Sequence, residues 1–444
     1  MAASTRRTTR PCTASGPWRW RRRGRCSTGR GACERAAHSV CVPHRASGQP
    51  RRSRPAPRRG VRPARRGNPG RRRAGVRNGP VLRLEPRDHR RRAAGGGGHV
   101  RLAVVGAGAI GGTIGASLVR AGHDVTFVDA DVDHVAAIRT SGLRIEGPID
   151  AFRVAAPAYV PTEVPGTFET VLLCVKAHAT AAATQDLLPF LATDGHVVSA
   201  QNGLNELVIA TIVGRQRTVG CFVNFGADYL EPGVIHYGGR GAVVLGELDG
   251  IDTARLRSLV TMFRQFDADA KGSNNIWGFL WAKLAVGSMI FATALTDEGI
   301  AACYDMPAYR PVFTAIAREV LAVAEAREVS PEPFDGFDPS AFMPGVPQEV
   351  TMRSLDDMVA FNRRSAKIHS GVWRDLAVRK RRTEVDAQLG TIPGLAADVG
   401  RETPLVSRIV EMIHEVEHGL RTRSLENLRE LDELWRHGAA EEGS

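Results

Sequence analysis

Residues 100–129 read VRLAVVGAGAIGGTIGASLVRAGHDVTFVD, and this stretch decides the fold of the part that follows. An apolar run rich in β-branched residues, 100–105, leads directly into a Gly-x-Gly-x-x-Gly loop. The next segment, 113–121, has the pattern of a helix and ends at Gly122. A strand, a glycine loop and a helix in this order are the context in which such a loop binds a dinucleotide. We therefore predict a Rossmann-type domain at this point of the chain.

Each glycine of the loop has its own physical reason. Gly106 permits the tight turn, Gly108 lets the backbone approach a pyrophosphate, and Gly111 lets the helix pack closely on the strand. The pyrophosphate then lies at the helix N-terminus, where unpaired amides and the helix dipole favour an anion. Ala109 and Ile110 complete the predicted cofactor-binding loop.

A second strand, 124–128, ends at Asp129. A carboxylate at this place accepts hydrogen bonds from both hydroxyls of a ribose. It would also repel a 2′-phosphate, and the next arginine is as far away as Arg139. These features favour NAD over NADP, although either nicotinamide cofactor is admitted. The alternative for Asp129 alone is a solvated acid at the end of a strand.

Two further polar side chains follow apolar strands. The strand predicted over 170–175 is followed by Lys176, and the strand predicted over 195–200 is followed by Gln201, Asn202 and Gly203. Open α/β sheets bind their ligands beyond the carboxyl ends of the strands, so Lys176 and Asn202 are candidate site residues. Asn-Gly is also a common turn pair, and these residues alone leave the two interpretations balanced.

From 276 to 435 nearly every segment has helical periodicity, which predicts an all-α domain after the α/β domain. The helix expected over 276–295 is apolar almost all round, and Lys283 is its single charge. A buried unpaired ammonium is costly, so Lys283 needs a carboxylate, a ligand or a water-filled cleft, unless its stem carries the charge to the surface. Glu384 lies in a charge-rich segment, which by itself is typical of a solvated face.

The first 99 residues differ in composition from the rest. They hold 28 Arg, no Lys and three acids, a net charge of +25, whereas the other 345 residues carry 32 basic and 44 acidic side chains, a net charge of −12. Low hydrophobicity with such a charge predicts a disordered tail. Three interpretations compete: a nucleic-acid-binding arm, an organelle transit peptide, and translated sequence upstream of the true start, which we favour. Nucleic acid is not favoured as a partner, because aromatic residues that stack on bases are confined to Trp18 and Trp20.

The remainder divides into an expected α/β domain at 100–268, a helical domain at 269–437 and a short tail at 438–444. Cys174, Cys221 and Cys303 are widely spaced and form no CxxC, which argues against a disulfide framework or a metal site and suits a reducing cytoplasm. The Arg-rich start lacks the apolar core of a secretory signal, and Lys283 interrupts the most apolar stretch. We therefore expect no membrane span and a cytoplasmic location.

The order of five motifs over roughly 100–437 resembles the ketopantoate reductase (2-dehydropantoate 2-reductase) family. The motifs are GAGAIGG at 106–112, VK at 175–176, QNG at 201–203, WAKL at 281–284 and TEVD at 383–386. The resemblance implies a Rossmann domain, a helical C-terminal domain, and a cleft between them for a nicotinamide cofactor and a small 2-oxo acid. It implies the reduction of 2-dehydropantoate to (R)-pantoate in pantothenate biosynthesis, or of a related 2-oxo acid, and it suggests a homodimer.

The resemblance also implies roles for individual residues. Lys283 matches the family's catalytic lysine, and Glu384 matches its substrate-binding glutamate. Asn202 matches a residue shared by the cofactor and substrate pockets, while Ala227 and Lys176 match positions close to the cofactor. In such a site Lys283 stabilises the developing alkoxide and protonates it, and Glu384 orients the ammonium or holds a substrate hydroxyl.

The chain departs from the family pattern in three places. Two asparagines that share a helical face with the lysine are replaced by Gly287 and Phe291. Asp129 and Ala130 stand where many members have an arginine for the 2′-phosphate, and either Ser370 or its neighbour takes the substrate-binding serine position. These departures admit a bulkier or less hydroxylated 2-oxo acid than ketopantoate. A function of another class, a dinucleotide-binding regulatory protein without turnover, would need neither the lysine nor the glutamate.

Overall fold

The computed structural model of the chain describes residues 101–364 and 368–442, with the side chains described up to 438. All of these residues fall in one unit of the chain by their contacts. The tail expected over 1–99, and every interpretation of it, lies outside the described residues.

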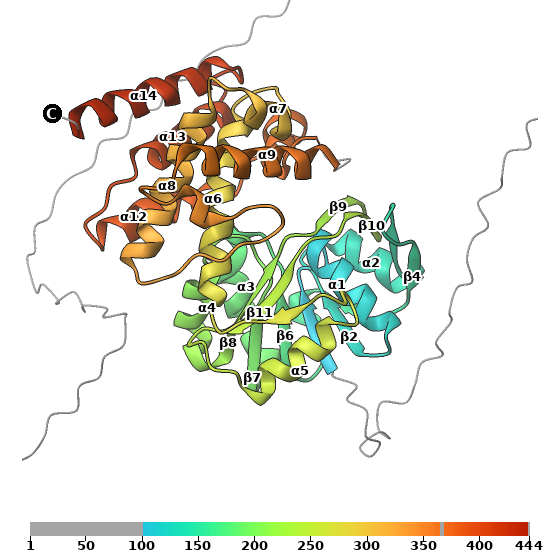
Figure 1. The fold of residues 1–444 in the computed structure, drawn as a ribbon. Coiled ribbons are helices and arrows are strands. Elements are labelled where there is room, and N and C mark those ends of the chain that lie inside the picture. The colour runs from blue at the N-terminus through green and yellow to red at the C-terminus, as the bar shows by residue number, and fades with distance from the viewer. Residues whose placement is uncertain (1–100, 365–367, 443–444) are drawn as a thin grey trace, which may run out of the picture. The chain divides into compact units, whose positions relative to one another are not determined.

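A sheet of eight strands forms the centre of the α/β domain (Figure 1). Its strand order is β12-β11-β8-β7-β6-β1-β2-β5, and neighbouring strands are parallel except for β8 and β11. The chain reverses its direction of travel across the sheet at β1, whose carboxyl end is therefore the switch point at which such sheets bind ligands. The strands are β1 (Arg101–Val105), β2 (Asp124–Val128), β5 (Ala158–Tyr159), β6 (Phe168–Leu173), β7 (Leu191–Ser199), β8 (Thr218–Val223), β11 (Val243–Glu247) and β12 (Lys271–Gly272).

Helices cover both faces of this sheet, because alternate residues of its strands are apolar on both sides. In β1, Leu102 and Val104 belong to the core shared with α1 and α5, whereas Ala103 and Val105 belong to the core shared with α4. The helices of this domain are α1 (Ala109–Arg120), α2 (Val132–Ser141), α3 (Thr180–Asp186), α4 (Asn205–Val213) and α5 (Ala254–Phe263).

A second sheet of four strands, β4-β3-β10-β9, was not predicted from the sequence. Strands β9 and β10 pair antiparallel, β10 pairs parallel to β3, and the sheet lies against α1. Its strands are β3 (Leu143–Glu146), β4 (Phe152–Val154), β9 (Gly226–Glu231) and β10 (Val234–Gly239).

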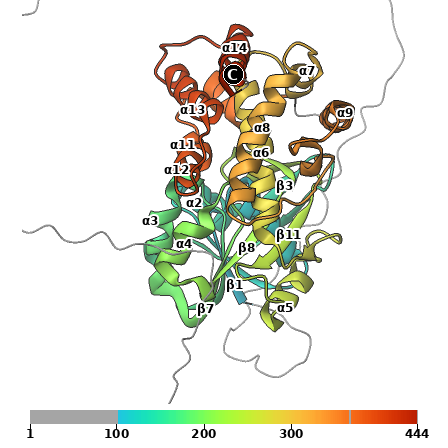
Figure 2. The same cartoon turned by 60° about the vertical axis from the view of Figure 1, so that its left-hand side comes forward.

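The C-terminal part is helical, as predicted. In both views α6 stands between the large sheet and the other helices (Figure 1 and Figure 2). One apolar core joins the two domains, since it contains Phe222 of β8, Leu284 of α6 and Val320 of α8. The helices are α6 (Ile276–Ala294), α7 (Ile300–Asp305), α8 (Arg310–Ala326), α9 (Gln348–Arg364), α10 (Gly371–Arg374), α11 (Val385–Gln388), α12 (Ile392–Ala397), α13 (Pro404–Glu417) and α14 (Glu426–Glu442).

Helix α6 is the one helix in the described part of the chain that is long and apolar enough to cross a membrane. However, 72% of its apolar window is buried inside the protein, where it contacts β8, β11 and α8. These are the surroundings of a core helix.

Several predicted boundaries need correction. Helix α1 begins at Ala109 rather than at 113, because the loop takes up helical geometry directly after Gly108. The helix predicted over 179–191 is wrong in length: α3 ends at Asp186, and a 3₁₀ turn with Pro189 near its start leads into β7. Strand β12 pairs with β11 beyond residue 268, so we propose that the domain boundary lies between β12 and α6.

Candidate active site

The glycine loop has the geometry that its sequence predicts. Gly106 has a φ of +89°, and a Cβ there would lie 2.7 Å from the Val175 nitrogen, so only glycine fits. A Cβ on Gly111 would collide with the carbonyl oxygen of Gly106. By contrast, a Cβ on Gly108 would meet nothing within 4 Å, and this residue begins α1 without a side-chain cap. The open side of Gly108 and the uncapped N-terminus of α1 fit the pyrophosphate of a dinucleotide.

Asp129 lies half-buried at the carboxyl end of β2. Its Oδ2 accepts a hydrogen bond from the Ala107 amide at 2.8 Å, and its Oδ1 accepts one from the Asp131 amide at 2.9 Å. Each carboxylate oxygen keeps a lone pair for a ribose hydroxyl. Asp129 therefore also orders the glycine loop, a role that its position at a strand end did not indicate.

His134 holds the glycine loop in place, and its sequence position did not predict this. This fully buried side chain of α2 accepts a hydrogen bond from the Gly233 amide at Nδ1, at 2.9 Å. The proton is thereby assigned to Nε2, which lies 2.9 Å from the Ala107 carbonyl oxygen and donates to it. His134 thus links the glycine loop to the turn that contains Gly233. Its only signal in the sequence is a histidine beside apolar helix positions, which does not point to a glycine loop.

Lys283 projects from α6 toward the carboxyl end of β8. Its Nζ donates a hydrogen bond to the carbonyl oxygen of Val223, the last residue of that strand, and lies 5.3 Å from the centroid of the Phe222 ring. The residue is partly buried, and its Nζ ends at the Val223 carbonyl oxygen.

Burial lowers the pKa of the Lys283 ammonium to about 8, even though nearby acidic groups raise it. Desolvation disfavours the charged form, and an opposite charge favours it. The groups that act on it by charge are Cys221, Asp335, Glu384 and Glu206.

Glu384 connects the helical domain to the loop that follows β6. Its Oε2 lies 2.6 Å from the Lys176 Nζ, and its Oε1 accepts a hydrogen bond from the Ala177 amide at 2.7 Å. The Glu384 side chain is 11% exposed, whereas that of Lys176 is 55% exposed. The structure therefore brings two predicted site residues together across the domain interface.

Helix α13 holds the segment on both sides of Glu384. The Thr383 amide donates to Glu417 Oε1 at 2.7 Å, and His414 lies 2.8 Å from Asp386 and 3.2 Å from Glu417. Partial burial lowers the pKa of His414, but the hydrogen bonds to these two carboxylates outweigh it, so the pKa is raised.

Asp335 is a second residue that the analysis missed. It forms a two-residue turn with Gly336, with φ values of 42° and 84°, on a hairpin of the helical domain. Its Oδ2 accepts hydrogen bonds from the Asn224 Nδ2 at 2.7 Å and from the Ala242 amide at 2.9 Å. The hairpin therefore fastens to the residue that follows Val223. An Asp-Gly pair between apolar residues is a recognised turn signal, so this feature was readable in principle.

The remaining predicted residues lie around this centre. Exposed Asn202 follows β7, and its carbonyl oxygen accepts a hydrogen bond from Asn205 at 2.6 Å. Ser370 caps α10 by accepting the Trp373 amide at 3.0 Å, and Ala227 lies on β9 opposite Tyr237. A Cβ on Gly287 would meet nothing within 4 Å. No hydrogen bond in the described part of the chain joins these residues to Lys283 or Glu384, and their roles stay predictions.

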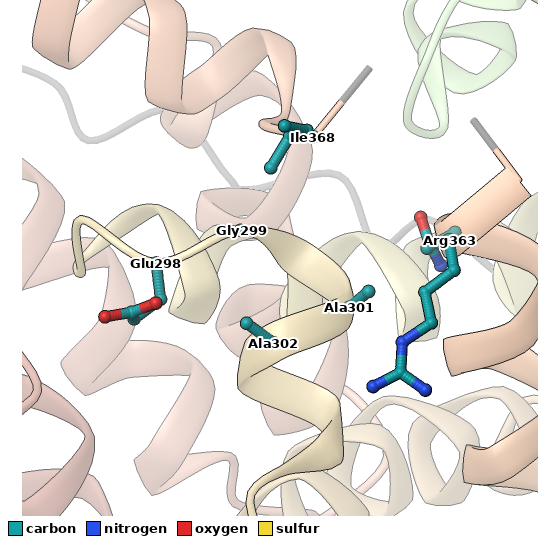
Figure 3. A pocket seen from close by; sticks show the side chains of 7 residues that line it. Glu298, Gly299, Ala301, Ala302, Arg363 and Ile368 are labelled. Atoms are coloured by element: carbon teal, nitrogen blue, oxygen red, sulfur yellow. The ribbon is translucent and has the colours of Figure 1, made fainter. Parts of the chain in front are cut away.

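A hollow on the helical domain is separate from this site. Figure 3 shows it beside the start of α7, with Arg363 of α9 at its rim. None of the predicted site residues lines it, so we do not assign it to the candidate active site. Its lining residues are Glu298, Gly299, Ala301, Ala302, Asn362, Arg363 and Ile368.

Two family models match the chain. The model "Ketopantoate reductase PanE/ApbA" matches residues 102–250, and the model of the C terminal part of the same family matches residues 275–417. The chain belongs to the ketopantoate reductase family. The resemblance seen in the five motifs is confirmed, and with it an oxidoreductase that uses a nicotinamide cofactor.

Individual relatives agree with the family models. A 2-dehydropantoate 2-reductase of Halobacterium salinarum is 28% identical over 319 residues, which cover 71% of this chain and 98% of the relative. The protein of the same name from Pyrococcus abyssi is 32% identical over 193 residues, 43% of this chain and 62% of the relative.

Solved structures confirm the fold. The crystal structure of 2-dehydropantoate 2-reductase from Geobacter metallireducens is 26% identical with a TM-score of 0.62, covering 71% of this chain and 99% of that one. D-Mandelate dehydrogenase, solved with NADH and anilino(oxo)acetate, is 23% identical with a TM-score of 0.64, covering 72% and 99%. The second likeness concerns the fold alone.

Proposed function

We propose that this reductase converts a 2-oxo acid to the 2-hydroxy acid with a reduced nicotinamide cofactor, and that Lys283 is its general acid. The first candidate substrate is 2-dehydropantoate, whose reduction gives (R)-pantoate for pantothenate biosynthesis. One observation carries the proposal: the single charge of an apolar core helix lies at the carboxyl end of β8, within electrostatic reach of Glu384.

Lys283 has the chemistry that the reaction needs. The bound nicotinamide supplies a hydride to the ketone carbon, so that negative charge develops on the carbonyl oxygen. The Lys283 ammonium stabilises this oxygen and gives it the proton of Nζ, becoming a neutral amine. A pKa of about 8 keeps most of the lysine protonated at neutral pH and makes it a stronger acid than an exposed lysine. The hydrogen bond to Val223 fixes the direction in which Nζ points.

Glu384 is the candidate substrate ligand of the helical domain. Its two oxygens are already oriented by Lys176 and the Ala177 amide, and each keeps a lone pair for a substrate hydroxyl. Asn202 would add an amide at the end of β7, and Ser370 would add a hydroxyl at the start of α10.

We propose NADH as the preferred cofactor. In this binding mode the Asp129 carboxylate would face the ribose and repel a 2′-phosphate, and the two acids that follow it in the sequence, Asp131 and Asp133, would add to the repulsion. We expect about a 10-fold lower KM for NADH than for NADPH, which corresponds to about 1.4 kcal/mol.

The substrate proposal includes 2-oxo acids bulkier than ketopantoate. Gly287 lies one turn after Lys283 on α6, and the space beyond its Cα is open. Phe291, another turn on, is buried in the core and offers no polar group. A substrate with a larger apolar side chain fits the open space beside Gly287, while a substrate hydroxyl, where one is present, would meet Glu384.

The test is the initial rate of NADH and NADPH oxidation by the full chain with ketopantoate and a panel of bulkier 2-oxo acids. Turnover of ketopantoate would support the pantoate-forming reaction. Turnover of another 2-oxo acid alone would keep the mechanism and change the pathway. Cofactor binding without any turnover would favour the regulatory alternative. The homodimer and the cytoplasmic location stay predictions.

A further inference from the structure

Glu206 is the most unusual group near the site that the mechanism does not use. Its side chain is 0% exposed, and neither carboxyl oxygen has a hydrogen-bond partner among the described residues. Burial of a carboxyl group without partners is strongly unfavourable, so such a group in a native fold needs an explanation.

The fold places Glu206 and Lys283 at the end of one strand. Glu206 lies in the first turn of α4, which begins directly after the QNG segment that follows β7. Helices α4 and α6 both contact β8. The carbonyl oxygen of Val223, the last residue of this strand, accepts a hydrogen bond from the Lys283 ammonium. Because β7 and β8 are parallel and α4 connects them, the first turn of α4 lies at the edge of the sheet where β8 ends, the edge at which Lys283 bonds Val223.

The two groups also influence each other by charge. Burial raises the pKa of Glu206 to about 7, and the nearby ammonium of Lys283 partly opposes this shift. In turn, the carboxylate of Glu206 raises the pKa of Lys283 against the effect of burial. Three other polar groups act on Glu206: its own backbone amide, the Cys221 thiol and the Ser199 hydroxyl. The Ser199 hydroxyl makes no hydrogen bond of standard geometry to the carboxyl group.

We propose that Glu206 is a positioning residue of the reaction: a buried counter-charge that keeps Lys283 protonated at the pH of catalysis. This inference rests on the proposed role of Lys283 as general acid. This role explains why a carboxyl group without hydrogen bonds lies in the interior: its negative charge stabilises the Lys283 ammonium at the end of β8. A purely structural explanation, a carboxylate at the N-terminus of α4, predicts no effect on the titration of Lys283.

The direct test is the titration of Lys283 in the full chain and in the Glu206→Gln and Glu206→Met variants. The chain has only five lysines, so labelling of the lysine ε-carbon gives few NMR signals, and Lys283→Arg removes and thereby assigns one of them. Removal of the carboxylate should lower the titration midpoint of Lys283 by up to about one pH unit, because Cys221, Asp335 and Glu384 also act on Lys283 and Glu206 contributes least of the four. The basic limb of kcat/KM should move by the same amount, with KM for the cofactor unchanged.

Glu319 provides a matched control. It is a partly buried glutamate whose pKa burial also raises to about 7, but its oxygens accept hydrogen bonds from the amides of Leu405 and Val406 at 2.9 Å each. Glu319→Gln should therefore leave the titration of Lys283 unchanged, although it too removes a carboxylate whose pKa is raised.

Glu206→Met keeps the test decisive if Glu206→Gln does not fold. It replaces a buried acid that has no hydrogen bonds with an apolar side chain of similar length, so we expect no loss of Tm. A folded Glu206→Met protein in which Lys283 titrates as in the unmodified chain would overturn the inference. The NMR readout needs no turnover, so it is independent of the proposed function. That function fails separately if Lys283→Ala leaves turnover unchanged.

Discussion

The proposed cofactor side and the proposed substrate side of this site are held together in different ways. Around the glycine loop, Asp129 and His134 both bond Ala107, and all three residues belong to the α/β domain. On the substrate side the partners come from different domains: Lys283 bonds Val223, and Glu384 bonds Lys176. The contacts that order the glycine loop lie within one domain, whereas those of Lys283 and Glu384 exist only where the two domains meet. Changes on the two sides should therefore have separable effects.

The largest effect is expected for Lys283→Ala. Loss of the general acid should lower kcat about 100-fold to 10,000-fold, while the Kd for NADH stays the same, because the glycine loop does not depend on α6. Stopped-flow turnover and cofactor titration measure the two quantities. Lys271→Ala, at an exposed lysine of β12, is the control and should retain full activity. Equal losses of turnover and cofactor binding would contradict the separation of the two sides.

Glu384→Gln should have the next largest effect. The variant weakens the ion pair with Lys176 and removes a charged acceptor for the substrate, so KM for the 2-oxo acid should rise about 10-fold to 100-fold. Cofactor affinity should change little. Glu402→Gln, at an exposed glutamate of the helical domain that has no place in the site, is the comparison variant and should keep a normal KM. A normal KM in Glu384→Gln would remove this residue from the substrate site.

Substitutions of two glycines of the loop test the proposed cofactor side in different ways. Gly108→Ala should weaken NADH binding about 10-fold without lowering Tm, because its methyl group would enter only the open space assigned to the pyrophosphate. Gly106→Ala should instead destabilise the protein by about 1–3 kcal/mol or more, since this residue has a positive φ and a close backbone neighbour. Calorimetry and cofactor titration distinguish the two. Unchanged NADH affinity in Gly108→Ala would place the pyrophosphate elsewhere.

The smallest effect concerns pH and the α13 contacts beside Glu384. Because the pKa of His414 is raised above its ordinary 6.5 in the folded protein, its protonated form adds stability that is fully present below that value. This contribution is lost as the pH rises through the higher folded value. His414→Gln should therefore flatten the decline in the free energy of unfolding above pH 6.5, as denaturant titrations at several pH values can measure. An identical pH dependence in both proteins would show that His414 does not clamp the segment.

The same contrast explains how much could be predicted from the sequence. The glycine loop, β2 and Asp129 are contiguous, so residue order alone indicated the fold and the cofactor. Lys283 was conspicuous because it is the one charge in an apolar helix. Glu384 was not conspicuous, because it lies among other charged residues in the sequence. Only the family resemblance pointed to it.

Other parts of the site had no usable signal in the sequence. His134 and Glu206 acquire their surroundings only through contacts between distant segments. The strands of the second sheet are short: the residues of β3, LRIE, do alternate between apolar and polar, but a run of four is too brief to tell from a loop, and β4 has three residues. The Asp335 turn was readable, but nothing local showed that it fastens to the end of β8.

The most direct test of the central claim is steady-state oxidation of NADH by the full chain, with ketopantoate and bulkier 2-oxo acids, from pH 6 to pH 9. We predict that at least one of these acids is reduced, and that the rate of its reduction falls at basic pH as Lys283 loses its proton. NADH binding with no reduction of any 2-oxo acid across this range, or a rate that does not depend on Lys283, would contradict it.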